Sequence, residues 1–130
     1  MSIDEWMYSK ILASTSVTAI TTSVSPDFLP RDITAPAIVY INNIGWDKNL
    51  LIRQPIISIV GYHNTKTGVQ SLSDALYNIF DTSTAYVKET SSNINVESVQ
   101  IVNSITGRYN RDNDNWYCVL DVLVNYWERR

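Results

Sequence analysis

The last stretch of the chain, Asn103–Arg130, indicates the fold most clearly and reads NSITGRYNRDNDNWYCVLDVLVNYWERR. It contains the end of one strand, a short charged turn and a long strand rich in aromatic residues. From Trp116 onward one face of that strand is apolar or amphipathic, which predicts a fully buried side. The members of this face are Trp116, Cys118, Leu120, Val122, Val124 and Tyr126. The opposite face mixes apolar and polar groups, which predicts partial cover. Its members are Tyr117, Val119, Asp121, Leu123, Asn125 and Trp127.

Working outward from this strand, the chain shows two helical patterns. Ser2 and Glu5 fit a capping box, and Ile3, Met7 and Ile11 follow at four-residue spacing, so we expect a first helix to about Ala13. A central helix is expected over Thr67–Phe80, with Thr67 and Gln70 as its capping box. Its apolar face comprises Val69, Leu72, Leu76, Ile79 and Phe80.

Strand patterns surround the central helix. Ala37–Ile41 follows Pro36 as a short apolar run, and Leu50–Tyr62 forms a second strand in which Pro55 indicates a bulge or an edge. We expect a tight hairpin between these two strands. A third strand runs from about Val96 to Arg108 and pairs with the closing strand.

Two polar stretches complete the chain. Ser14–Ser25 is compatible with a short helix or a loop, and we favour the helix; Asp81–Asn93 is expected to be an exposed loop. The order helix, hairpin, helix, hairpin predicts one domain over residues 1–130. Its fold class is α+β, a mainly antiparallel four-stranded sheet with helices packed on one face.

Composition excludes several classes of function. The 130 residues include 10 Lys or Arg and 13 Asp or Glu, and the basic residues form no cluster beyond the terminal Arg129–Arg130 pair. We therefore expect no sequence-specific nucleic-acid binding. No apolar run approaches the roughly 20 residues of a membrane span, and the first ten residues lack the pattern of a secretory signal. We expect a soluble protein made in a cytoplasm.

The sequence lacks the residue groupings that catalytic and metal-binding sites need. The four glycines are isolated, so no glycine-rich loop can cradle a phosphate. Cys118, the one cysteine, is expected to be a buried hydrophobe, and His63, the one histidine, a strand-end or surface side chain. The run Asp112–Asn115 lacks the glycine and glutamate of an EF-hand loop, so we expect a solvated turn. We therefore predict no enzyme activity, no cofactor and no metal.

Three features together resemble the phage tail terminator proteins, the family typified by the lambda tail terminator. One is the proline-led strand Ala35-Pro36-Ala37-Ile38-Val39-Tyr40, and another is the central helix between two hairpins. The most specific is the turn Tyr109–Asp114 followed by Trp116, Asp121 and the ending Tyr126-Trp127-Glu128. The resemblance covers nearly the whole chain. The broader set of tail-completion and head-to-tail joining proteins shares the same pattern.

The resemblance implies a structural virion protein of the tail neck, a hexameric ring on the head-proximal end of the tail tube. Such a ring ends tube polymerisation and offers a surface to the head connector, so its partners are copies of itself, the tube protein and the connector. A closed ring needs two different contact patches on each subunit.

We assign these patches as hypotheses. For the contact between subunits we expect the outer face of the last strand: Tyr117, Val119, Leu123 and Trp127. For the contact with tube or connector we expect two charged loops: Trp46, Asp47, Lys48, Arg108, Arg111, Asp112 and Asp114. Two alternatives remain open, namely another neck adaptor and a small α+β enzyme or ligand-binding domain whose site forms only on folding.

Overall fold

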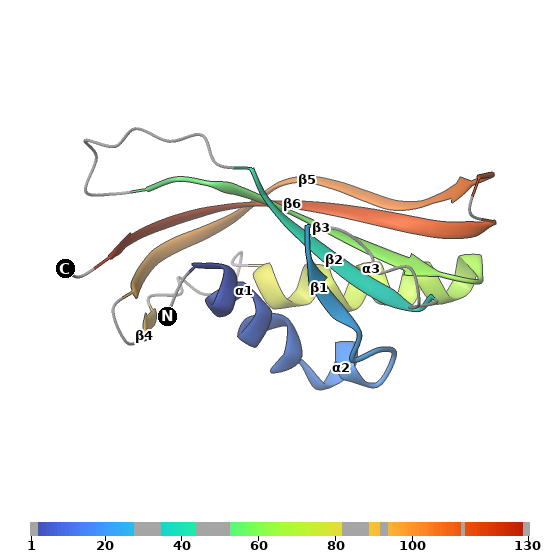
Figure 1. Cartoon of the computed structure of the whole chain (residues 1–130), viewed down its shortest axis with the longest axis horizontal. Helices are drawn as coiled ribbons and strands as arrows, with labels where there is room; N and C mark the ends of the chain where they lie inside the picture. The colour runs from blue at the N-terminus through green and yellow to red at the C-terminus, as the bar shows by residue number, and fades with distance from the viewer. Residues whose placement is uncertain are drawn as a thin grey trace.

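The computed structural model describes residues 3–27, 35–43, 53–81, 89–91, 94–112 and 114–128. Within these residues the chain forms three helices and six strands. In chain order these are α1 (Ile3–Leu12), α2 (Thr15–Thr18), β1 (Val24–Pro26), β2 (Ala37–Asn43), β3 (Ile56–His63), α3 (Lys66–Phe80), β4 (Glu89–Ser91), β5 (Ile94–Asn110) and β6 (Asn115–Glu128). All three helices lie on the same side of the sheet (Figure 1).

The six strands form one sheet in the order β1-β2-β3-β6-β5-β4. The four predicted strands are its centre, and β2, β3, β6 and β5 pair antiparallel as expected. The prediction of a four-stranded sheet is wrong, because β1 and β4 extend it at both edges. Each has three residues and lies in a stretch too polar for a strand pattern. β1 runs parallel to β2, so the sheet is mixed.

The Ser- and Thr-rich stretch therefore divides into a helix and a strand. The Ser14 hydroxyl accepts a hydrogen bond from the backbone N–H of Val17 at 3.3 Å and caps α2. Farther on, the Thr21 hydroxyl donates to the carbonyl of Pro36 at 2.8 Å, and the Ile38 N–H donates to the carbonyl of Ser23 at 2.8 Å. These bonds hold β1 against β2. A periodicity argument alone does not reveal such long-range contacts.

The expected pairing of β2 with β3 is present and runs from Ala37 opposite Tyr62 to Asn43 opposite Ile56. The predicted tight connection between them falls on residues 44–52, which lie outside the described residues. The regular strand begins at Ile56 because Pro55 lacks a backbone donor. Before Pro55, Arg53 still exchanges backbone hydrogen bonds with Tyr126, at 2.7 and 3.0 Å. The chain thus pairs with β6 on both sides of the proline.

The central helix begins two residues earlier than the predicted capping box. Thr65 has an extended backbone, with φ of −125° and ψ of 152°, and its hydroxyl accepts from the Gly68 N–H at 3.0 Å. Thr65 is therefore the N-cap, and Thr67 lies inside the helix. The predicted apolar face is otherwise confirmed, since Val69, Leu72, Leu76 and Phe80 are buried. In α1 the expected Ile3, Met7 and Ile11 are buried too, and Ser2 lies outside the described residues.

The core fills the space between the helices and one face of the sheet. The predicted inner face of β6 is buried from Cys118 to Tyr126, and Trp116 packs against the same core while half-buried. This arrangement leaves the opposite face of β6, from Tyr117 to Trp127, pointing away from the helices. We call the face of the sheet opposite the helices the outer face.

Candidate functional site: the outer face of the sheet

The outer face of β6 continues across β3 as rows of paired side chains. Tyr117 lies opposite Tyr62, Val119 opposite Val60, and Leu123 opposite Ile56. Tyr117, Val119, Leu123 and Trp127, the four residues predicted for the contact between subunits, all lie on this face and are half-buried. Ile56 is 39% exposed. Apolar and aromatic area is therefore in contact with solvent at the middle of the sheet.

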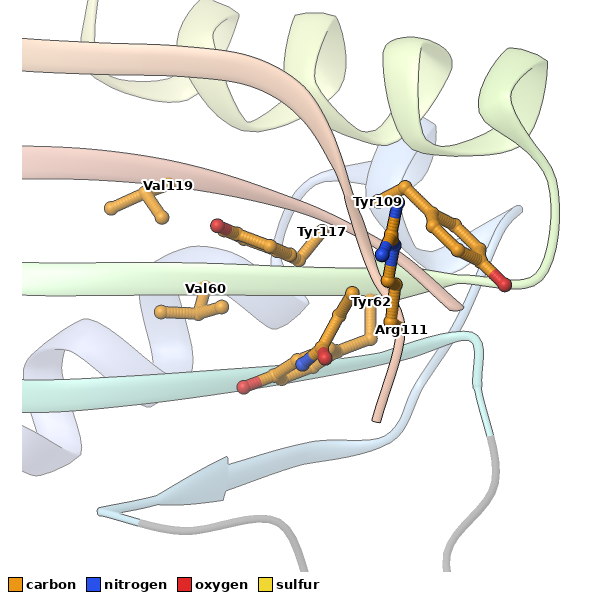
Figure 2. Close-up of a pocket in the computed structure, with 7 residues that line it drawn as sticks. Val60, Tyr62, Tyr109, Arg111, Tyr117 and Val119 are labelled. Carbon is orange, nitrogen blue, oxygen red and sulfur yellow. The ribbon is translucent and has the colours of Figure 1, made fainter. Parts of the chain in front are cut away.

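Near the β5–β6 turn this face is hollowed into an open pocket of about 450 Å³. Seven residues line it: Val60, Tyr62, Tyr109, Asn110, Arg111, Tyr117 and Val119. Figure 2 shows the rings of Tyr62 and Tyr117 extending along the sheet, and Arg111 reaching in from the turn. Burial raises the pKa of Tyr62, with a further contribution from Tyr117. The Tyr62 ring thus presents apolar area and a neutral hydroxyl in the pocket that Arg111 also lines.

A polar cluster interrupts the apolar surface between Val119 and Leu123. The Asp121 carboxylate accepts a hydrogen bond from the Ser58 hydroxyl at 2.7 Å and one from the Asn103 side-chain amide at 3.2 Å. These three residues come from β6, β3 and β5, so the cluster ties together three neighbouring strands. The Asp121 carboxylate thus has hydrogen-bond partners within the sheet, so a partner protein can cover this face without leaving the carboxylate unpaired.

Toward the end of β6, two more side chains of the outer face find partners on β5. The Asn125 amide donates to the Ser98 hydroxyl at 2.6 Å, and the Trp127 indole N–H donates to the Glu97 carboxylate at 3.0 Å. The side-chain oxygen Oδ1 of Asn125 is buried with no hydrogen-bond partner. Trp127 is thus fixed in orientation, with its ring half-buried on the outer face.

The charged turn between β5 and β6 is exposed as expected. Arg108, Arg111, Asp112 and Asp114 all lie in contact with solvent. The side-chain oxygen Oδ1 of Asn110 accepts from the Asp112 N–H at 3.0 Å, and Asp114 has a positive φ of 50°. These features are typical of a tight turn built from Asn and Asp.

One tyrosine braces the turn. The Tyr109 hydroxyl donates to the Asp114 carboxylate, and this bond is the main reason that the pKa of Tyr109 is raised. The Tyr109 and Trp116 rings lie 5.4 Å apart, centroid to centroid. Among the described residues no group of three or more His, Cys, Asp or Glu side chains could hold a metal ion.

The two contact surfaces predicted separately, one between subunits and one with tube or connector, meet in the structure. Arg111, predicted for the contact with tube or connector, shares a pocket with Tyr117 and Val119, predicted for the contact between subunits. Trp46, Asp47 and Lys48 lie outside the described residues. Sequence reasoning missed Val60 and Tyr62. The signal was available, because β3 carries apolar residues at both odd and even positions from Ile56 to Tyr62.

Cys118 is buried on the inner face, as predicted, with 2% of its surface exposed. Burial is the largest cause that raises the pKa of the thiol, to about 11. A thiol of this kind stays protonated at neutral pH and is a poor nucleophile. The His63 ring lies at the start of α3, where its Nδ1 accepts from the Thr65 N–H at 3.2 Å.

Fold and surface together define a class: a small α+β protein with a mixed sheet, helices on one side and a partly apolar, aromatic face on the other. None of the helices in the described part of the chain is long and apolar enough to cross a membrane.

Comparison with known proteins adds a match of fold. No protein-family model matches the chain, and no curated protein matches it. Among solved structures, the chain is similar to one from the virion of a native gene transfer agent particle. The TM-score is 0.69 at 11% sequence identity, and the match covers 92% of this chain and 90% of that one. At this identity the similarity is one of fold, and it extends over nearly the full length of both chains.

Proposed function

We propose that the protein is a structural subunit of a phage virion, a ring that caps the head-proximal end of the tail tube. The observation that carries the proposal is the outer face of the sheet. It leaves Tyr62, Tyr117, Val119 and Leu123 partly exposed, although the Asp121 carboxylate among them is satisfied within the sheet. A contiguous apolar and aromatic surface of this kind is typical of a protein interface.

The fold supports the same proposal. The neighbour with a similar fold belongs to a virion, and the likeness spans 92% of this chain. A virion subunit needs surfaces for assembly and no reactive groups, and the single thiol of this chain is buried and protonated. The resemblance to tail terminators in the turn Tyr109–Asp114 and the ending Tyr126-Trp127-Glu128 leads us to choose the tail cap among virion roles.

Capping requires no bond to be made or broken. A growing tube presents unsatisfied subunit edges at its end. A ring that fits this end on one side, and differs from a tube subunit on the other, stops further addition. In a closed ring each subunit contacts the next through two different patches. We assign the outer face, with Tyr117, Val119, Leu123 and Trp127, to one of these patches.

The charged residues supply the contacts along the ring axis in this proposal. Arg108, Arg111, Asp112 and Asp114 lie on an exposed turn at one end of the sheet, where they can meet the tube or the connector. We place Trp46, Asp47 and Lys48 in the same contact. Exposed charges of opposite sign at a rim set register and partner choice more than affinity.

The test is deletion of the gene from the particle-producing genome, followed by electron microscopy of the tails. A cap predicts overlong tails. Normal-length tails without heads indicate a neck adaptor instead, and intact infectious particles contradict both roles. A ligand-binding or enzymatic role predicts particles that assemble normally.

Complementation of the deletion tests the residues. Asp112→Lys and Arg111→Glu should fail to restore joined particles while the purified variants keep the thermal stability of the wild type. Asp74→Lys is a matched control, since Asp74 is an exposed carboxylate on α3, on the other side of the sheet. It should restore particles fully. Equal yields from Asp112→Lys and Asp74→Lys would remove the turn from the contact.

A further inference from the structure

The pocket on the outer face combines one cation with aromatic rings. Arg111 is the one charged residue among the described residues that line it, and it reaches in from the turn toward Tyr62 and Tyr117 (Figure 2). A guanidinium group matches a carboxylate, which it can bind through two parallel hydrogen bonds. The tyrosine rings offer apolar area with a polar tip. The pocket therefore fits a carboxylate that stands next to an aromatic or aliphatic side chain.

The pocket is also continuous with the rest of the outer face. Val60 and Val119, which line it, are paired across β3 and β6, and the same two strands carry the exposed pair Ile56 and Leu123 farther along. An occupant of the pocket thus belongs to the surface that covers the whole face. A protein segment, and not a small metabolite, is the matching occupant.

Helix α1 presents such a segment on the other side of the same chain. Asp4 and Tyr8 are four residues apart, so their side chains lie on one side of the helix. Both are exposed, Tyr8 by 41%. The Asp4 carboxylate accepts a hydrogen bond from the Asn42 side-chain amide at 3.3 Å. A carboxylate has about four acceptor positions, so this bond leaves room for an arginine.

Negative charge gathers around this part of α1. The pKa of Tyr40 on β2 is raised, first by burial and then by four neighbours: Asp4, Tyr8, Asp27 and Glu5. Three of these neighbours are carboxylates, and they act on the same tyrosine from α1 and from the end of β1. The surface near Asp4 is therefore complementary in charge to the pocket that holds Arg111.

Helix α3 is the weaker match among the described helices. It also exposes a carboxylate and a tyrosine on one side, Asp74 and Tyr77. Asp74 is the only acid of this helix, however, and Lys66 lies in its first turn. The charge of α3 is thus balanced, whereas α1 has two adjacent acids, Asp4 and Glu5.

We propose that helix α1 of one copy of this chain docks in the outer-face pocket of the next copy. In this contact the Asp4 carboxylate meets Arg111, and the Tyr8 ring packs against Tyr117. The inference rests on the proposed ring and deepens it, because it names the second of the two patches that a ring subunit needs. Since α1 lies in the helix layer and the pocket on the opposite face, one subunit can offer both to two neighbours (Figure 1).

A charge swap in the complementation assay tests this contact. Asp4→Arg and Arg111→Asp each bring like charges together and should lower the yield of joined particles at least about tenfold. A chain that carries both changes should restore most of the yield. The matched control combines Arg111→Asp with Asp74→Arg, which moves the same charges but places the arginine on α3. It should remain defective.

Co-expression shows whether the pair forms between chains. When Asp4→Arg and Arg111→Asp are produced together as separate chains, a ring of alternating copies pairs every pocket with a compatible helix, so particles should be restored. The melting temperatures of the purified variants separate loss of contact from loss of folding. Asp4→Asn is a milder second variant, because its side-chain oxygen can still accept from Asn42, and it should lower the yield with an unchanged melting temperature.

Two results would overturn the inference and leave the cap in place. One is a full yield from Asp4→Arg alone. The other is a double variant that melts normally and is as defective as Arg111→Asp, which would assign Arg111 to the tube or the connector. In both cases deletion of the gene would still produce overlong tails. Intact particles without the gene would instead remove the proposed cap, and this inference with it.

Discussion

Replacing Gly61 by alanine tests how closely α3 packs on the sheet. Gly61 lies in β3, opposite Cys118 of β6. A Cβ atom added there would lie 2.7 Å from Cδ2 of Leu72 and 2.9 Å from Sγ of Cys118, whereas ordinary contacts are 3.4–4 Å. Leu72 has no exposed surface and Cys118 only 2%, so neither side chain can turn toward solvent.

The expected loss follows from two opposing effects. Overpacking a core lowers the free energy of unfolding by about 1–3 kcal/mol. Alanine also gives the unfolded chain less conformational entropy than glycine does, which raises the free energy of unfolding by about 0.4–1 kcal/mol. We therefore expect Gly61→Ala to lower the free energy of unfolding by about 1–2 kcal/mol, measured by urea denaturation at neutral pH. In a Leu72→Ala background the same change should cost less, because the added Cβ then meets only Sγ of Cys118, at 2.9 Å.

Gly107→Ala is the matched control. Its added Cβ would meet a single methyl, Cγ1 of Val69, at 3.1 Å, so we expect a change within about 0.5 kcal/mol. The reasoning is refuted if Gly61→Ala is as stable as the wild type, or if Gly107→Ala costs more than Gly61→Ala.

Three further predictions concern single contacts. Gly68→Ala places a Cβ 2.2 Å from the His63 ring, so it should lower the stability of the wild type. In a His63→Ala variant the ring is gone, and the same change should stabilise the helix by up to about 1 kcal/mol. A double-mutant cycle in urea measures the difference. The unfolded Cys118 thiol, with a pKa of 9.0, ionises before the folded one, with a pKa of about 11, so its contribution to stability falls as pH rises. Between pH 8 and pH 10 the wild type should lose about 1.4 kcal/mol more than Cys118→Ala, and equal losses would contradict the burial of the thiol. Ser58→Ala removes a 2.7 Å hydrogen bond to Asp121 and should cost about 1–2 kcal/mol in thermal or urea unfolding, whereas no loss would show that the outer-face cluster adds nothing to the fold.

The central part of the fold could be predicted because its signals are local. Alternation from Trp116 to Tyr126 defines both faces of β6, and the spacing of Val69, Leu72 and Leu76 defines the buried side of α3. Each of these patterns repeats often enough within one element to fix its type and its inner side. The pairings β2–β3 and β5–β6 were expected from the two hairpins, whereas the pairing of β3 with β6, which joins the hairpins into one sheet, was not predicted.

The edges could not be predicted in this way. β1 and β4 have three residues each, fewer than alternation needs, and β1 is held by contacts such as Thr21 to Pro36 that cross 15 residues. The candidate site was incomplete for a similar reason. Tyr62 and Val60 belong to it through their pairing with Tyr117 and Val119, and strand register is a property of the folded sheet.

Electron microscopy of the purified protein mixed with tail tubes tests the proposed cap most directly. We expect closed six-fold rings with a central hole at one end of each tube, and tubes that no longer elongate when more tube protein is added. Rings should be lost when Tyr117 and Leu123 on the outer face are both changed to serine. Tube ends that bind no protein and continue to grow would contradict the account.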